Sequence, residues 1–241
     1  MDKVDSLQLQ AIRTLKKTRD ALIPRCIRKF PLFRLLQSWL FQGFMGAHWK
    51  EILFRFCLEL ALITVLSIIL STMVQWYLLW AVLVVHTFMW TFNGHFWALK
   101  INDNKRLVKN TPKRIYCYIE GLSERINNTE SITACVLTGS IVEERFHEFS
   151  DLDIWFTKKS GFFIGIWAYM IGVRERSIAF FQRIPIELYF YDTENYSANV
   201  SKKPLLLLKD ADKRWEKKAQ CSFSLKNFSF NKMVFFNNTK K

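Results

Sequence analysis

Hydrophobic and charged positions divide this chain into an uncharged central stretch and two basic flanking regions. Residues 60–99 contain no Asp, Glu, Lys or Arg, and most of them are aliphatic or aromatic. One helix across the hydrocarbon core of a bilayer needs about 20 such residues, so the stretch is long enough for two. We therefore predict two membrane-spanning helices, the first starting near Ile52, with a tight turn near Ser71, Thr72 and Gln75.

Basic residues on both sides of this stretch predict how the two helices are oriented. Lysine and arginine favour the cytoplasmic side of a membrane, and an even number of spans returns the chain to the side where it began. The predicted location is a membrane, with two spans and with both termini and the domain that follows the spans in the cytoplasm. The basic residues are Arg25, Arg28, Lys29, Arg34 and Lys50 before the stretch, and Lys100, Lys105 and Arg106 after it.

A buried helical hairpin inside a soluble protein is the alternative interpretation, although uncharged runs of this length are rare in soluble cores. Three polar residues, His86, Asn93 and His95, lie in or beside the second predicted span. Polar groups at membrane depth are candidates for a function, and hydrogen bonding between helices is the other interpretation. Their pattern does not predict a metal site.

The region before the uncharged stretch combines basic side chains with Phe, Leu and Trp. Residues 31–44 predict a helix with an apolar face, which lies along the membrane surface or packs on the soluble domain. The first residues are charged and lack the apolar core of a signal peptide, so we expect no cleaved signal. We divide the chain into a basic amphipathic helical region at 1–50, a transmembrane hairpin at 51–99 and a cytoplasmic domain at 100–241.

The cytoplasmic domain begins with a predicted helix and a buried strand. Thr111 and Pro112 form a helix-start signal, apolar residues then recur at helical spacing, and Asn127 and Asn128 end the pattern. The sequence ITACVLT, at residues 132–138, is short, uncharged and rich in β-branched side chains. These features are typical of a buried strand.

A second predicted strand carries two acidic residues on one face. In DLDIWFT, Asp151 and Asp153 alternate with apolar residues. Successive side chains of a strand point to opposite faces, so both aspartates project to the same side. Carboxylates this close repel one another unless a cation lies between them, and oxygen ligands suit a hard divalent ion such as Mg²⁺. The segment therefore predicts a magnesium site.

Gly139 and Ser140 directly follow the first strand, and residues 141–149 predict a short helix. Glycine allows a close approach of the backbone to a ligand, and a helix N-terminus offers N–H groups and the positive end of its dipole. Ser140 adds a hydroxyl donor. These features predict a phosphate-binding turn, and a triphosphate held there with its metal on Asp151 and Asp153 would form a phosphoryl or nucleotidyl transfer site.

This arrangement resembles the signature of the DNA polymerase β-like nucleotidyltransferase superfamily, whose small members carry GS, a spacer and DxD. The resemblance covers about residues 111–215. It implies an α+β fold with a small mixed sheet and flanking helices, here joined to the transmembrane hairpin. It also implies that Gly139 and Ser140 bind a nucleoside triphosphate, and that Asp151 and Asp153 hold two Mg²⁺ ions. Paired metals stabilise the attacking and leaving oxygens of an in-line displacement at the α-phosphorus.

In that superfamily a third carboxylate from a neighbouring strand completes the site. The alternating segment at residues 183–192 predicts a strand with Glu187 near its start, so we take Glu187 as the third catalytic acid and metal ligand, with Asp192 in reserve. The chain departs from the family pattern in two ways. Aspartate is more usual at the third position, and many small members have a basic residue and a glycine where this chain has Glu143 and Glu144.

The remaining segments add one predicted helix and several open assignments. Residues 161–184 predict a core helix whose uncharged part is too short to span a bilayer, although Phe162, Phe163 and Trp167 are candidates for membrane contact. The chain after Cys221 alternates and predicts a terminal hairpin. Basic residues after the third strand are candidates for phosphate or lipid contacts, with a solvated surface as the alternative: Lys202, Lys203, Lys209, Lys213 and Arg214.

Composition restricts the classes of molecule that this chain is expected to bind. A formal net charge of +14 suits nucleic acid, phosphorylated substrates or an anionic membrane, and the uncharged stretch favours the membrane. The five cysteines are scattered without metal-ligand spacing, which fits a reducing compartment.

The sequence thus predicts a membrane-anchored, Mg²⁺-dependent enzyme that transfers a nucleotidyl or related phosphoryl group from a nucleoside triphosphate. A lipid-linked or membrane-associated molecule is one candidate acceptor. The alternatives are a non-catalytic nucleotide-binding membrane sensor or assembly protein, and nucleotidyl transfer to nucleic acid. The predicted partners are the bilayer and the nucleotide, and self-association through the transmembrane region is a further candidate interaction.

Overall fold

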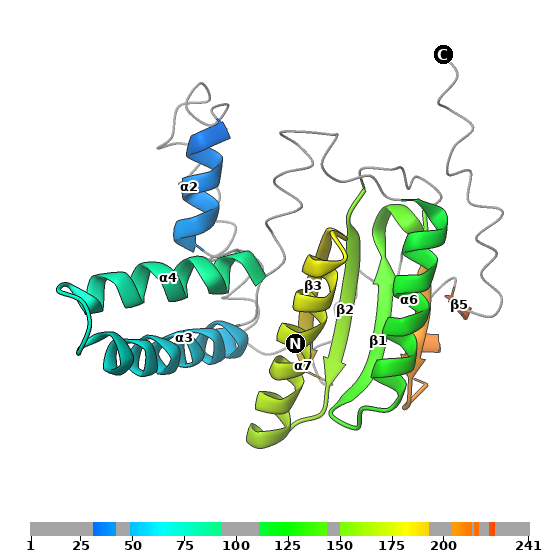
Figure 1. Cartoon of the computed structure of the whole chain (residues 1–241). Helices are drawn as coiled ribbons and strands as arrows, with labels where there is room; N and C mark the ends of the chain where they lie inside the picture. The colour runs from blue at the N-terminus through cyan, green and yellow to red at the C-terminus, as the bar shows by residue number, and fades with distance from the viewer. Residues whose placement is uncertain are drawn as a thin grey trace, which may run out of the picture. The chain divides into compact units, whose positions relative to one another are not determined.

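The computed structural model divides the chain into two compact units, Met1–His95 and Phe96–Lys241, and each is described by itself (Figure 1). The described residues are 31–41, 49–92, 111–143, 150–192, 204–213, 215–216 and 222–224.

The first unit, over its described residues, consists of the helices α2 (Pro31–Phe41), α3 (Trp49–Leu70) and α4 (Tyr77–Phe92). α3 and α4 are joined by a turn at residues 71–76, where the sequence predicted one. Met73 and Val74 close this turn by donating backbone hydrogen bonds to the carbonyl of Leu70.

Only α3, among the described helices, is long and apolar enough to cross a membrane. Its outward side chains are apolar and exposed, including Phe56, Val65 and Ile68. α4 is more apolar than α3 but has 16 residues, and about 20 are needed to cross the hydrocarbon core. The predicted second span is therefore not established by the structure, because α4 falls short and residues 93–100 lie outside the described part.

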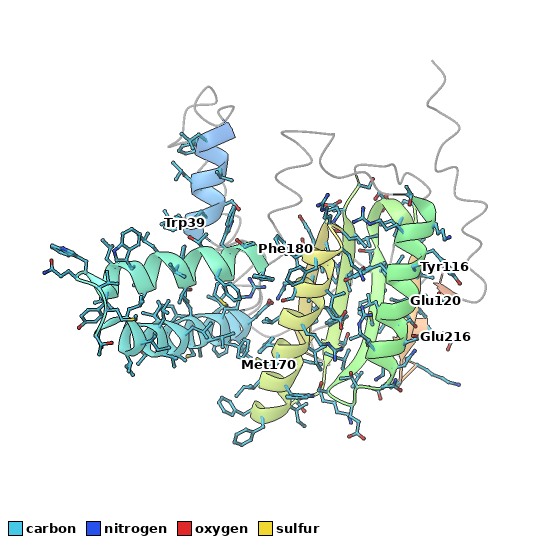
Figure 2. The ribbon with its side chains drawn as sticks, viewed as in Figure 1. Trp39, Tyr116, Glu120, Met170, Phe180 and Glu216 are labelled. Atoms are coloured by element: carbon cyan, nitrogen blue, oxygen red, sulfur yellow. The ribbon has the colours of Figure 1, made fainter. Side chains whose placement is uncertain are left out.

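His86 joins the three helices of this unit through hydrogen bonds. Its Nδ1 lies 2.7 Å from Glu59 Oε1 on α3, and its Nε2 lies 2.9 Å from the carbonyl oxygen of Trp39 on α2. Trp39 also packs edge-on against the imidazole ring (Figure 2). Of the two interpretations of His86, the contacts agree with hydrogen bonding between helices. Asn93 and His95 lie outside the described residues.

The second unit is a five-stranded mixed sheet with strand order β3-β2-β1-β4-β5 and two helices. β1 pairs antiparallel with β2 and β4, whereas the β2–β3 and β4–β5 pairs are parallel. A mixed sheet with flanking helices confirms the coarse fold prediction. The elements are α6 (Pro112–Asn127), β1 (Ile132–Thr138), β2 (Leu152–Lys158), α7 (Phe162–Phe181), β3 (Ile186–Asp192), β4 (Leu205–Asp210) and β5 (Ser222–Ser224).

α6 begins and ends where the sequence predicted. The Thr111 side chain caps its start by accepting a hydrogen bond of 3.4 Å from the Arg114 backbone N–H. At the other end, Lys209 Nζ donates to the carbonyl oxygens of Ile126 at 3.0 Å and Thr129 at 2.5 Å. A cation at this end complements the helix dipole. Lys209, one of the predicted phosphate or lipid contacts, thus holds β4 to α6.

The core lies between one face of the sheet and the two helices, which cover that face together (Figure 1). At Gly172 of α7, an added Cβ would lie 2.5 and 2.7 Å from ring atoms of Phe190, so glycine permits the close contact of helix and sheet. The largest fully buried side chains include Ile115, Ile119, Leu122 and Ile126 of α6, and Leu152, Ile154 and Phe156 of β2.

A buried ion pair connects α6 to α7. Glu175 is fully buried on α7 and accepts hydrogen bonds from Arg125 Nε at 3.1 Å and Arg125 Nη2 at 2.8 Å. Arg174 donates to the same carboxylate at 2.8 Å. Removing one partner of such a pair leaves an uncompensated buried charge, which is strongly destabilising. The pair therefore sets how the two helices lie side by side.

Three sequence predictions need correction or completion in this unit. The predicted helix at residues 141–149 is a 3-10 turn at Gly139–Ile141 in its described part, and residues 144–149 lie outside that part. β4, which the sequence did not predict as a strand, pairs antiparallel with β1 from Leu206 to Asp210. β5 lies in the first part of the predicted terminal hairpin and pairs parallel with β4, and the chain after residue 224, where the hairpin turn was predicted, lies outside the described residues.

Candidate functional site

Three carboxylates meet at the start of β2 and β3. Asp151 directly precedes β2, Asp153 is its second residue, and Glu187 is the second residue of β3. Each offers an oxygen, and these three oxygens all lie within 4.8 Å of one another. The parallel pairing of the two strands puts Asp153 and Glu187 opposite each other in register. The structure thus brings together the three acids that the sequence singled out.

The electrostatics of this cluster are unfavourable without a cation. Burial raises the pKa of the Glu187 carboxyl, the Tyr189 hydroxyl lowers it by donating a hydrogen bond to Oε2, and the charge of Asp151 raises it again. Burial and the Glu187 carboxylate together raise the pKa of Tyr189 above its usual value. A hard divalent ion with oxygen ligands would offset this repulsion, so the donor set fits Mg²⁺ or Mn²⁺.

Gly139 lies directly against one of the three carboxylates. Its φ of +79° is in the region that favours glycine, and a Cβ at this position would overlap the Asp153 carboxylate. Its carbonyl oxygen accepts backbone hydrogen bonds from Val142 at 3.1 Å and Glu143 at 3.0 Å, which closes the turn. The glycine therefore allows the backbone to approach the acidic cluster closely.

Ser140, the predicted phosphate donor, follows this glycine. Its hydroxyl oxygen is shielded from solvent and has no hydrogen-bond partner among the described residues. A hydrogen bond from a ligand to such a shielded hydroxyl would be favourable, because buried polar groups are normally hydrogen-bonded. The hydroxyl is thus available to a polar ligand at the turn, which is a 3-10 turn over Gly139–Ile141 in the part of the predicted helix that the structure describes.

A row of aromatic residues continues the carboxylate face along the strands. Trp155 stacks on Tyr191 with ring centroids 4.7 Å apart and planes 8° apart, and it lies 5.6 Å from the Tyr189 ring. Burial raises the pKa of Tyr191 to about 12. Farther along, Trp215 covers the face and donates from Nε1 to Thr157 Oγ1 at 3.2 Å.

We did not predict these aromatic residues as part of the site. Their position on the carboxylate face could have been read from the alternation of side chains, because Trp155 continues the series Asp151 and Asp153, and Tyr189 and Tyr191 continue the series that begins at Glu187. Tyr189 contributes directly, since its hydroxyl orients the Glu187 carboxylate.

The backbone of the reserve acid, Asp192, lies at the opposite end of β3 from Glu187. Asp192 is the last residue of β3 and pairs in register with Lys158 at the end of β2, whereas Glu187 pairs with Asp153 near its start. At about 3.3 Å per residue, the backbones of Asp192 and Glu187 are separated by most of the strand. The choice of Glu187 over Asp192 therefore agrees with the register. Glu144 lies outside the described residues.

The acidic cluster predicts stabilisation by a divalent metal. Adding Mg²⁺ or Mn²⁺ at a hundredfold excess over its Kd should raise the free energy of unfolding of the second unit by about 2.7 kcal/mol. We expect Asp153→Asn to remove this gain, and to be at least as stable as the native chain without metal because one repelling charge is gone. Thermal unfolding followed by tryptophan fluorescence measures both effects. Asp212→Asn, at an exposed carboxyl outside the cluster, should keep the gain, and equal shifts in all three proteins would contradict a metal site here.

The close contact of Gly139 predicts that a single methyl group disturbs the site. Gly139→Ala should displace the Asp153 carboxylate and weaken Mn²⁺ binding at least tenfold, as measured by electron paramagnetic resonance. Gly161→Ala is the matched control, because its φ of +126° imposes comparable backbone strain while its nearest neighbour is Ile164 at 3.4 Å. Unchanged Mn²⁺ affinity in Gly139→Ala, or an equal loss in both variants, would show that the methyl group does not act through Asp153.

Comparisons of the chain with protein-family models, curated proteins and solved structures returned no match. The resemblance to the DNA polymerase β-like nucleotidyltransferases stays a prediction that rests on the motif residues.

Proposed function

We propose that this protein is a divalent-metal-dependent transferase that moves a nucleotidyl or related phosphoryl group from a nucleoside triphosphate to an acceptor. The observation that carries this proposal is the meeting of Asp151, Asp153 and Glu187 beside the Gly139 turn, with carboxylate oxygens within 4.8 Å of one another. This is a donor set for hard divalent ions, which bind the phosphates of nucleotide substrates in many transferases.

Each part of the site has a distinct proposed role. Asp151, Asp153 and Glu187 hold Mg²⁺, which supplies charge stabilisation for the oxygens of the transferred phosphate. Gly139 leaves room for the triphosphate near Asp153, and the Ser140 hydroxyl donates to a phosphate oxygen. Glu187, whose pKa is raised by burial, is placed to accept the proton of the acceptor hydroxyl.

Membrane attachment is part of the proposal. α3 has the length and composition of a span, and we propose that α4, extended by residues beyond Phe92, forms a second one. This arrangement would keep the second unit in the cytoplasm, where nucleoside triphosphates are abundant. Attachment to a membrane raises the effective concentration of membrane-associated partners.

The activity is tested with the full-length chain purified in detergent. Each labelled nucleoside triphosphate is incubated with Mg²⁺ and with lipid extract, RNA or a soluble cell extract as acceptor source. We expect transfer of label from at least one nucleotide, and a loss of at least a thousandfold in Asp151→Asn/Asp153→Asn because two of the three proposed metal ligands lose their charge. Asp212→Asn should retain full activity. Nucleotide binding without turnover in any mixture would favour the non-catalytic sensor, and label in RNA would favour transfer to nucleic acid.

The hydrogen bond from Tyr189 predicts a smaller, graded effect. Groups that orient a metal ligand typically contribute 10- to 100-fold to metal affinity or activity. Tyr189→Phe removes the donor to Glu187, so the half-saturating Mn²⁺ concentration should rise by about tenfold or more. Tyr191→Phe removes a hydroxyl from the same strand face without touching the carboxylate and should leave this concentration unchanged. Identical Mn²⁺ dependence in the two variants would rule out this orienting role.

A further inference from the structure

The exposed hydrophobic residues of the second unit are concentrated on one helix. Among its described residues, every exposed large hydrophobic side chain belongs to α7. Soluble surfaces rarely gather such side chains in one place unless they bind something. The exposed side chains are Phe162 at 76%, Phe163 at 81%, Ile164 at 39%, Trp167 at 63%, Met170 at 41% and Phe181 at 73%.

Four of these residues are here named the outer stripe of α7, which the exposed Arg174 interrupts between the last two: Phe163, Trp167, Met170 and Phe181. At 3.6 residues per turn their positions fall on one side of the helix. The opposite side is buried against the sheet, where Tyr169 packs edge-on against Phe190 at 5.1 Å. The helix therefore has two apolar sides, and only one of them is covered by the unit itself.

The exposed charged side chains on α7 and the residues that flank it all have the same sign. From residue 158 to 183, the exposed charged side chains are those of Lys159, Arg174 and Arg183. The single acid of this segment, Glu175, is fully buried and held by both Arg174 and Arg125. An approaching surface thus meets apolar side chains with a positive rim.

We propose that the outer stripe of α7 docks into the interface of an anionic lipid bilayer. A helix with Phe and Trp on one side and basic residues beside them is typical of interfacial membrane binding, and basic residues gain from the negative potential of anionic lipids. The same chain carries α3, which is long and apolar enough to span, so a bilayer is within reach. A second copy of this basic chain would not complement the positive rim.

If α7 docks on a bilayer, the orientation of the acidic site restricts the kind of acceptor it can reach. This consequence rests on the proposed function. α7 packs on the sheet face that carries Phe156 and Phe190, and Asp153 and Glu187 lie on the other face. A helix is about 10 Å across with its side chains, so the helix and the sheet both separate the carboxylates from the bilayer. The site would open away from the membrane, toward a water-soluble acceptor instead of a lipid head group.

The docking surface is tested by photochemical cross-linking of the full chain. Trp167 is replaced by p-benzoylphenylalanine, and the protein is reconstituted in vesicles of equal parts phosphatidylcholine and phosphatidylglycerol. We expect peptides that contain position 167 to carry lipid adducts in mass spectra after illumination. The matched control places the same residue at Glu120, which is exposed on α6 (Figure 2) and should give at least tenfold less lipid adduct.

Any other outcome would contradict the proposal and would show what the stripe contacts instead of anionic lipid. Adducts to residues 49–92 would show that α3 or α4 covers the stripe, and cross-linked dimers would show that a second copy does. Absence of adducts would show a stripe that faces water. Equal lipid yields in phosphatidylcholine alone would contradict the role of the positive rim. The experiment needs no nucleotide, and Asp151→Asn/Asp153→Asn should give the same lipid adducts, so its failure is distinguishable from failure of the transferase proposal.

Discussion

The parallel pairing of β2 with β3 is the constraint on which the candidate site depends. This register places Asp153 opposite Glu187 on one face of the sheet, and Phe156 opposite Phe190 on the other. A slip of one residue would turn the carboxylate of one strand toward the helices and expose its apolar residues. The apolar packing under α7 therefore also holds the acids together, and a change in the core should reach the site through this pairing.

Bringing three carboxylates together is electrostatically unfavourable, and the packing around them keeps them in place. Three carboxylates share a half-buried space, and burial raises the pKa of Glu187. Elsewhere in the unit the buried charge of Glu175 is matched by Arg125, whereas near Glu187 the compensating contact is the hydroxyl of Tyr189. A buried acid held by arginines stabilises packing, whereas three converging carboxylate oxygens form a donor set that suits a cation. This contrast separates a structural ion pair from a candidate metal site in the same unit.

The two faces of the sheet carry different kinds of side chain, so the second unit has a polar face with the acids and an opposite face covered by helices. One side carries the acids and Trp155, and the other carries α7 with its outer stripe. If α7 lies on a bilayer, attachment and chemistry occur on opposite sides of the unit. Under the two proposals, the candidate site would face away from the bilayer, and the acceptor need not be a lipid.

The sequence by itself determined the ends of α6, the strands β1 to β3 and the face on which Asp151, Asp153 and Glu187 lie, because capping and alternation are local properties. It did not predict β4, since a run of four leucines after residue 204 lacks a period that separates strand from helix. Only the tertiary structure decided that β3 lies beside β2, that Asp192 is remote and that one side of α7 stays uncovered. These three features depend on contacts between segments that are distant in the sequence. A local pattern specifies which face of a strand or helix a residue occupies, but it does not specify which other element packs against that face.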